Sequence, residues 1–141
     1  MPSSTPDGEV LGAPPPDQPL VLVVDDNEKN LKLARDVLRA DGLRTLEAAT
    51  GAEAIQIAVG DLPDVILLDL RLPDMDGFDV LRELKGREAT ARIPVVAHTA
   101  LRTEADVDWL LEAGFAGYLE KPITVRDFPA QVRDHWRKAT G

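Results

Sequence analysis

The chain has 141 residues, of which 44% are hydrophobic, and a net charge of -9 at pH 7; its length and apolar content predict one domain with its own core. The negative charge argues against a protein that binds nucleic acid or an anionic membrane surface. The absence of cysteine excludes disulfides, thiol catalysis and thiolate metal sites. No apolar run approaches the roughly 20 residues that span a bilayer, and the amino terminus does not resemble a secretory signal, so we expect a cytoplasmic protein.

Residues 1–18 are rich in proline, with serine, glycine and acidic residues between the prolines. Such a composition buries too little apolar surface to offset the entropy lost on ordering, so it predicts a disordered tail. The folded domain is expected to occupy residues 19–139.

Five stretches of strand length follow, at residues 20–24, 43–48, 64–69, 93–99 and 116–120. The run Val65–Leu68 is apolar at every position, which is typical of a strand covered on both faces in a parallel sheet. The stretch Leu43–Ala48 is more polar and is expected at the edge of the sheet.

Helices are predicted between and after these strands. Asn27 is a plausible cap for the first helix, in which Leu31, Ala34 and Leu38 recur at helical spacing before Gly42. Thr50 and Glu53 resemble a capping box at the start of the second, and the third is expected over residues 77–85.

The last two helices carry more ambiguous signals. Thr103 is predicted to cap a helix with one inward face, formed by Val107, Leu110, Leu111 and Gly114. A final helix is expected over about 124–138, with Phe128, Val132, His135 and Trp136 on one side. Pro129 would cost this helix a backbone hydrogen bond, so either the helix begins near Phe128 or its first turn is distorted.

Alternating strands and helices with short connections predict a doubly wound α/β sandwich. In such a fold, ligands collect beyond the carboxyl ends of the strands. The residues that follow the predicted strands, and so are expected at this edge, are Asp25, Asp26, Asp69, Thr99 and Lys121.

These residue types support a narrow chemistry. Three carboxylates on one rim are suited to Mg2+, which prefers carboxylate and phosphate oxygens and keeps several waters. Asp69 would then serve as a nucleophile toward phosphorus and form an aspartyl phosphate. Lys121 would offset charge on the phosphoryl oxygens, and Thr99 would donate a hydrogen bond to them.

The order of these motifs resembles the receiver domain of bacterial response regulators over residues 20 to about 138. The matching pieces are Asp25-Asp26, Asp69 with the following Leu72-Pro73-Asp74-Met75-Asp76-Gly77, Thr99-Ala100, and Lys121-Pro122. The resemblance implies a CheY-like or flavodoxin-like three-layer (βα)5 fold, with a central five-stranded parallel sheet in the strand order 2-1-3-4-5.

The resemblance also implies a role for each residue of the site. Asp69 is expected to accept a phosphoryl group from a histidine kinase or histidine phosphotransferase. The Mg2+ ligands would be Asp26, Asp69 and the backbone carbonyl of Arg71, with Asp25 acting through water. Thr99, Ala100 and Lys121 would stabilise the phosphoryl group, Ala100 being small enough to leave the path to Asp69 open. Thr99 and Tyr118 match the switch pair, and the Lys121-Pro122 peptide bond is expected to be cis.

Only one helix is predicted after Lys121-Pro122, so no output domain is expected. The chain is similar to stand-alone receivers of the cell-cycle and phosphorelay kind, which signal through contacts with a downstream protein. The candidate partner surface comprises Trp109, Tyr118, Arg126 and Arg133. Trp109 should face solvent, where it is either an interface anchor or an ordinary exposed residue. Arg126, Arg133 and Arg137 form a basic stripe that is by default a solvated face.

His98 is expected to be a core histidine with satisfied hydrogen bonds rather than a ligand or proton relay.

Other function classes fit less well. A haloacid dehalogenase-type phosphatase needs a second aspartate two residues after the nucleophile, where this chain has Arg71. A nucleotide binder would need glycines after the first strand, where the chain has Asp25-Asp26-Asn27-Glu28. We therefore expect no separate substrate turnover. The serious alternative is a pseudo-receiver, an interaction module that works without phosphorylation.

Overall fold

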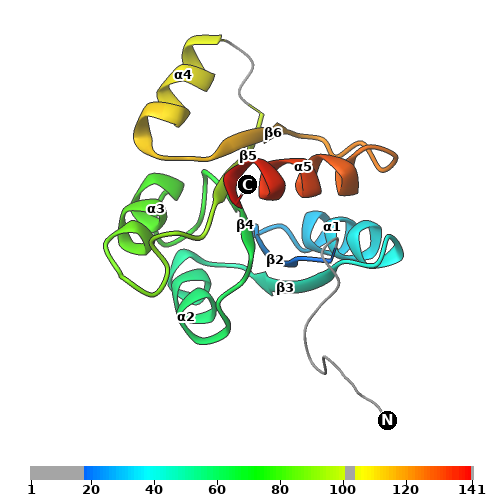
Figure 1. Cartoon of the computed structure of the whole chain (residues 1–141), viewed down its shortest axis with the longest axis horizontal. Coiled ribbons are helices and arrows are strands. Elements are labelled where there is room, and N and C mark those ends of the chain that lie inside the picture. The colour runs from blue at the N-terminus through cyan, green and yellow to red at the C-terminus, as the bar shows by residue number, and fades with distance from the viewer. Residues whose placement is uncertain (1–17, 101–103, 141) are drawn as a thin grey trace.

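The computed structural model describes residues 18–100 and 104–140. Its elements alternate along the chain as predicted (Figure 1): β2 (Leu20–Val24), α1 (Glu28–Ala40), β3 (Arg44–Ala48), α2 (Gly51–Asp61), β4 (Val65–Asp69), α3 (Gly77–Lys85), β5 (Val95–Thr99), α4 (Glu104–Ala113), β6 (Gly117–Glu120) and α5 (Phe128–Thr140). The predicted tail and the predicted cap Thr103 fall outside the described residues, apart from Gln18.

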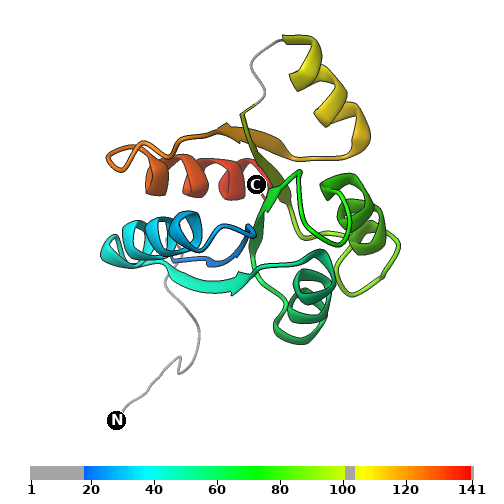
Figure 2. The same cartoon turned by 180° about the vertical axis from the view of Figure 1, so that it is seen from behind.

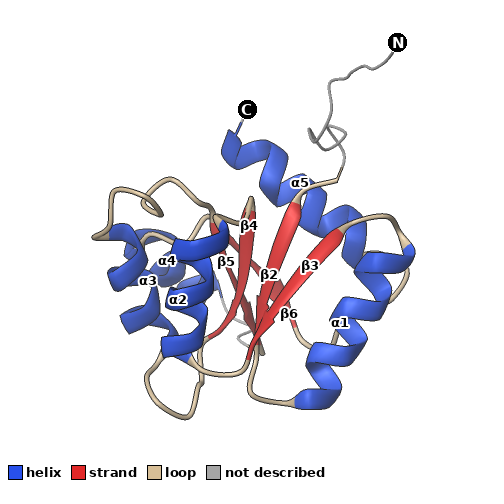
Figure 3. Cartoon of the chain, turned by 90° about the horizontal axis from the view of Figure 1, so that it is seen from below, coloured by secondary structure: helices blue, strands red, loops and turns tan. Residues whose placement is uncertain are grey.

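The five described strands form one parallel sheet in the order β3-β2-β4-β5-β6. This confirms the predicted order 2-1-3-4-5 and the edge position of the second strand. Helices cover both faces of the sheet (Figure 3), with α1 and α5 on one side and α2, α3 and α4 on the other. The fold is therefore the predicted three-layer sandwich.

The central strand β4 needs an uninterrupted apolar run because both of its faces are buried. All five of its residues are buried. Ile66 and Leu68 pack into the core under α2, α3 and α4, whereas Val65 and Leu67 pack into the core under α1 and α5. Each such side chain stabilises the fold by about 1.5–3 kcal/mol relative to exposure, so β4 holds both layers to the sheet.

Side-chain caps begin three of the helices. Asn27 accepts hydrogen bonds from the N–H groups of Lys29 and Asn30 at 2.9 and 3.1 Å, and Asp76 accepts one from Asp79. Thr50 accepts the N–H of Glu53 at 3.1 Å, as expected for a capping box.

The return bond of this capping box differs from the usual one. The Glu53 carboxylate accepts from the N–H of Ala49 at 2.7 Å, one residue before the cap.

The turn between β4 and α3 requires glycine at position 77. A Cβ added to Gly77 would lie 2.9 Å from the Cα of Leu70 and 3.1 Å from the carbonyl oxygen of Asp69. The backbone therefore doubles back closely against the end of β4, which places this turn beside Asp69.

The final helix begins at Phe128, not at Thr124. Pro129 is thus the second helical residue, where no backbone N–H is needed within the helix. This decides between the two alternatives that the sequence left open. Residues 125–127 form a turn, closed by a hydrogen bond of 2.9 Å from the Phe128 N–H to the Thr124 carbonyl.

The predicted inward face of α4 is partly wrong. Leu110 is fully buried and Val107 half-buried, but Leu111 is 49% exposed and Gly114 is also exposed. The helix contacts the sheet near its edge strand β6, so only a narrow stripe centred on Leu110 is covered.

Trp109 is 55% exposed, as the helical spacing predicted. It is nevertheless not isolated, because its ring centroid lies 4.6 Å from that of Phe78 on α3. Phe78 in turn makes an edge-on contact with Phe115.

The basic stripe predicted on the last helix does not form one solvated face. Arg126 lies before α5, in the exposed turn. Arg133 instead pairs with the Asp41 carboxylate and donates to the Asp41 carbonyl at 2.7 Å. Because Asp41 caps the end of α1, Arg133 ties α5 to α1, which lie side by side in Figures 1 and 2.

No helix within the described ranges combines the length and apolar character needed to cross a bilayer.

Candidate functional site

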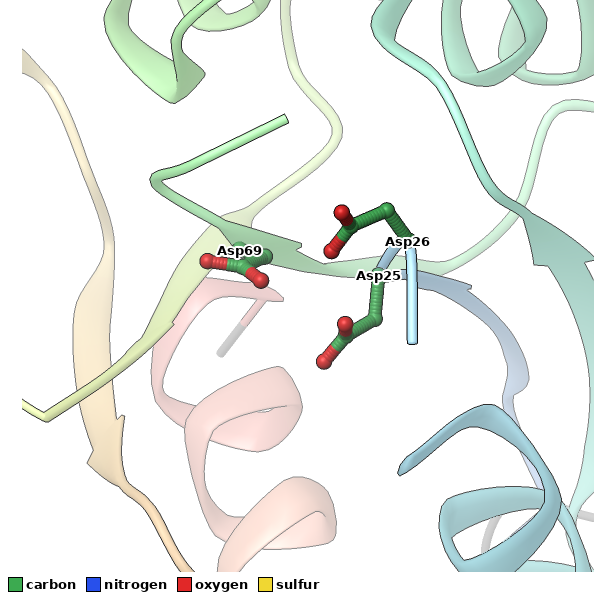
Figure 4. A group of neighbouring side chains, drawn as sticks. All are labelled: Asp25, Asp26 and Asp69. Atoms are coloured by element: carbon green, nitrogen blue, oxygen red, sulfur yellow. The ribbon is translucent and has the colours of Figure 1, made fainter. Parts of the chain in front are cut away.

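Three carboxylates meet at the carboxyl ends of the neighbouring strands β2 and β4 (Figure 4). Each of Asp25, Asp26 and Asp69 offers an oxygen within 4.8 Å of the others. Asp25 is 2% exposed and Asp69 9% exposed, whereas Asp26 is exposed. The parallel pairing of β2 with β4 brings these residues together across more than 40 positions of sequence, as the sequence predicted.

Asp25 is held by three donors. The backbone N–H of Asn27 donates to Oδ1 at 2.9 Å, and the side-chain amide of Asn30 donates to Oδ2 at 3.1 Å. The Lys121 ammonium donates to the same Oδ2 at 2.9 Å. Bonds to both oxygens fix the plane of this buried carboxylate.

Asp69 is held by two donors. The backbone N–H of Arg71 donates to Oδ1 at 2.9 Å, and Lys121 donates to Oδ2 at 3.0 Å. Lys121 therefore bridges Asp25 and Asp69. Burial lowers the pKa of Lys121, but hydrogen bonds and charge from Asp25 and Asp69 outweigh it and hold the pKa above its usual value. The ammonium thus stays charged at neutral pH.

The three carboxylates open into a cleft of about 560 Å³, lined by Asp25, Asp26, Asn27, Asn30, Asp69, Leu70, Arg71, Thr99, Ala100 and Lys121. All the predicted phosphoryl-stabilising and metal-binding residues are therefore in its wall. Lys121 directly follows β6, and the Lys121-Pro122 peptide bond is cis, as expected.

Thr99 and Tyr118 lie on the same face of the sheet. Thr99 follows Ala97 by two residues, so their side chains point to one side, and Ala97 is the direct partner of Tyr118 in β6. Tyr118 is half-buried against the core beneath α2, α3 and α4. The predicted switch pair is thus placed on the α4 side of the sheet.

The four residues of the candidate partner surface do not share that location. Trp109 lies on α4 and Tyr118 on β6, but Arg133 is directed to Asp41 on α1. Arg133 belongs to an intramolecular contact because α5 packs its residue-133 side against α1. The partner role of Arg133 stays a prediction.

His98 is buried, as predicted, but its hydrogen bonds are not fully satisfied. It is 3% exposed, its ring stacks on Phe128 at a centroid distance of 5.9 Å, and its Nε2 has no hydrogen-bond partner among the described residues. The apolar ring of Phe128 stacks on His98, where a polar hydrogen-bond partner was expected. Burial, helped by the Lys121 charge and opposed by Asp25, lowers the pKa of His98 to about 4.

Sequence reasoning missed two polar residues at this edge. Asn30 lies on the first turn of α1, and its position three residues after the predicted cap Asn27 was the available signal. Asp74 accepts the N–H groups of Gly51 and Ala52 at 2.8 and 2.9 Å, which joins the loop after β4 to the start of α2. These backbone hydrogen bonds lower the pKa of Asp74.

The donor set fits Mg2+. The cluster offers carboxylate oxygens only, one of its members is exposed to water, and the cleft has room for further oxygen ligands. Mg2+ is a hard cation that takes one or two protein carboxylates, waters and phosphate oxygens. The role of the Arg71 carbonyl remains a prediction.

Comparisons with known proteins agree with this geometry. A family model described as the response regulator receiver domain matches residues 21–133. The polar-differentiation response regulator DivK of Brucella ovis is 37% identical over 115 residues, which cover 82% of this chain and 94% of the relative. DivK of Brucella anthropi is 36% identical over the same lengths.

Solved structures with the same fold include two receivers. The receiver domain of the sensor histidine kinase PA1611 from Pseudomonas aeruginosa PAO1, which has a magnesium ion coordinated in its active site cleft, is 32% identical with a TM-score of 0.76. The match covers 85% of this chain and 98% of that one. The chemotaxis response regulator CheY4 of Vibrio cholerae matches with a TM-score of 0.79 at 24% identity, covering 84% and 98% of the two chains.

Proposed function

The chain belongs to the response regulator receiver domain family, and from this premise we propose that it is a single-domain response regulator that accepts a phosphoryl group on Asp69. The donor is a phosphohistidine on a histidine kinase or histidine phosphotransferase, and Mg2+ is required. Asp26 and Asp69 are the proposed metal ligands, with the Arg71 carbonyl, and Asp25 acts through water. Its similarity to DivK over 94% of the relative's length supports a stand-alone receiver.

One observation carries this proposal. Asp69 is a largely buried carboxylate at the end of a central strand, it lines an open cleft, and it is paired with the Lys121 ammonium. A carboxylate of this kind needs no general base to act as a nucleophile toward phosphorus.

The proposed reaction uses the chain's own residues as follows. A carboxylate oxygen of Asp69 attacks phosphorus as the P–N bond to the donor imidazole breaks. The electron pair of that bond stays on the imidazole nitrogen, which takes a proton from solvent. Lys121 offsets negative charge on the phosphoryl oxygens, and Thr99 donates a hydrogen bond to one of them. When bound, Mg2+ neutralises further charge on the same oxygens.

The proposed signal follows from the added charge. Phosphorylation adds about -1.5 to -2 charges at the rim, where Thr99 lines the same cleft as Asp69. Because Thr99 and Tyr118 share one sheet face, movement of the hydroxyl toward the phosphoryl group frees space for the Tyr118 ring. The proposed output is a change in contacts with a downstream protein over α4, β6 and α5.

The test is intact-protein mass spectrometry after incubation with Mg2+ and acetyl phosphate. We expect a gain of ~80 Da, one phosphoryl group, that disappears with a chelator and in Asp69→Ala. Asp61→Ala, which removes an exposed acid at the end of α2, should be phosphorylated like the wild type.

The opposite result is equally informative. If the folded wild-type protein gains no mass, the proposal is wrong, and the phosphorylation-independent pseudo-receiver becomes the better description. Circular dichroism of Asp69→Ala shows whether the loss of mass gain in that variant comes from unfolding.

A further inference from the structure

Asn30 is a neutral residue whose side chain lies in the wall of the acidic cleft. It lies in the first turn of α1, is half-buried, and lines the cleft beside Asp25. Its side-chain amide donates to Asp25 Oδ2 at 3.1 Å, the oxygen that also accepts from Lys121 at 2.9 Å.

A helical role does not account for this side chain. The cap of α1 is Asn27, whose side chain already accepts the backbone N–H of Asn30 at 3.1 Å. Inside a helix asparagine is less favourable than alanine by about half a kcal/mol. Among the residues that the structure describes, the side-chain amide of Asn30 donates to Asp25 alone, and this bond accounts for an amide at this position.

The bond restrains Asp25 without adding charge. An ionised carboxylate has about four lone-pair sites, and three donors already hold Asp25, from Asn27, Asn30 and Lys121. A second lysine at position 30 would give the same restraint but would repel a metal cation. An amide fixes the carboxylate and leaves the negative charge of the cluster unchanged.

We propose that Asn30 is a positioning residue of the metal site, which holds the Asp25 carboxylate in the orientation that favours Mg2+ binding in the cleft. The inference rests on the proposed function, because it concerns the same site. It assigns to α1 a direct part in that site, through a side chain that acts on the Asp25 carboxylate.

The experiment measures Mg2+ affinity by calorimetric titration of the full-length wild type, Asn30→Ala and Asn30→Leu. Leucine has the same branched arrangement of heavy atoms as asparagine but cannot donate, so it separates the hydrogen bond from the shape of the side chain. We expect both variants to bind Mg2+ about tenfold more weakly. This is the lower end of the range of effects that follows loss of a residue that orients a metal ligand. Gln56→Ala, which removes an exposed amide from α2, should bind like the wild type.

Two further readouts distinguish positioning from a structural role. The thermal midpoint without Mg2+ should be nearly unchanged in Asn30→Ala, since alanine suits a helix better than asparagine. Phosphorylation by acetyl phosphate should slow at low Mg2+ and recover at saturating Mg2+.

The outcomes separate this inference from the proposed function. If the wild type itself binds no Mg2+ and gains no phosphoryl group, both are wrong. If the wild type binds Mg2+ and both Asn30 variants bind equally well, the positioning role alone is wrong. A lower midpoint with unchanged Mg2+ affinity would also overturn it, because Asn30 would then serve the fold only.

Discussion

Lys121 is the cation that stabilises the acidic site when no metal is bound. Its ammonium bridges Asp25 and Asp69, and its side chain is 23% exposed while Asp25 is 2% exposed. Two nearly buried carboxylates this close repel each other unless a cation lies between them. The ammonium therefore competes with Mg2+ for the same negative charge.

Replacement of Lys121 by methionine should have opposite effects on stability and metal binding. We expect Lys121→Met to lower the free energy of unfolding without metal, since the carboxylates lose their partner. Mg2+ affinity should rise about tenfold or more, because a like charge is removed from a few Å away. Urea unfolding with and without Mg2+ measures both, and an unchanged affinity would contradict the competition.

His98 should make stability depend on pH in a defined window. Its folded pKa of about 4 lies below the ordinary 6.5, so the unfolded chain binds the proton first as the pH falls. The contribution of His98 to the free energy of unfolding is complete above pH 6.5 and is lost as the pH falls toward 4. Between pH 7 and pH 5 this loss is about 2 kcal/mol.

His98→Phe keeps an aromatic ring against Phe128 and cannot titrate. Urea unfolding at pH 7 and pH 5 should therefore show a smaller loss in the variant than in the wild type. Equal losses in the two proteins would assign the pH dependence to other groups.

The loop between β4 and α3 is joined to its neighbours at both ends. Asp76 caps α3, and Asp74 accepts two N–H groups at the start of α2. Gly77 allows the chain to return against Leu70. The loop that carries Arg71 past Asp69 is thus held by two helix starts as well as by the end of β4, where the Arg71 N–H donates to Asp69.

Asp74→Ala should lower the thermal midpoint of the protein, because two N–H groups at the start of α2 lose their acceptor. Phosphorylation of Asp69 should be retained, since Asp74 does not line the cleft. Asp61→Ala is the matched control and should be nearly neutral, because an acid at the end of a helix opposes the helix dipole. Thermal unfolding of the wild type, Asp74→Ala and Asp61→Ala measures these differences in stability.

The acidic cleft brings together residues from the ends of three strands of the sheet. Asp25 follows β2, Asp69 ends β4, and Lys121 enters from the loop after β6. Outside the cleft, the ion pair between Arg133 and Asp41 joins α5 to the end of α1. Occupancy of the cleft should therefore change the stability of the domain as one unit.

Removal of Mg2+ should lower the free energy of unfolding in a single cooperative transition. At a Mg2+ concentration 100-fold above Kd, the metal should stabilise the native state by about 2.7 kcal/mol relative to a chelator. Asp26→Ala should remove most of this difference, since it deletes the exposed carboxylate among the proposed ligands. A Mg2+ effect that persists in Asp26→Ala would place the ion elsewhere.

Much of the fold and site followed from local pattern. The apolar run of β4, the caps Asn27 and Thr50, and the residues that follow each strand predicted the layers and the meeting of Asp25, Asp26, Asp69 and Lys121, whereas the strand order was implied by the resemblance to receiver domains. These features depend on short-range rules: side-chain period, cap chemistry, and the convergence of parallel strands at one edge.

Only the tertiary structure decided the contacts between elements that are distant in sequence. It turned Arg133 toward Asp41, left Leu111 exposed, stacked His98 on Phe128, and joined Asn30 to Asp25 and Asp74 to α2. Helical spacing states which residues share a face, but not how wide a stripe the neighbouring element covers. That width, and the partner of each polar side chain, depend on how helices pack across the sheet, which no local pattern in the chain records.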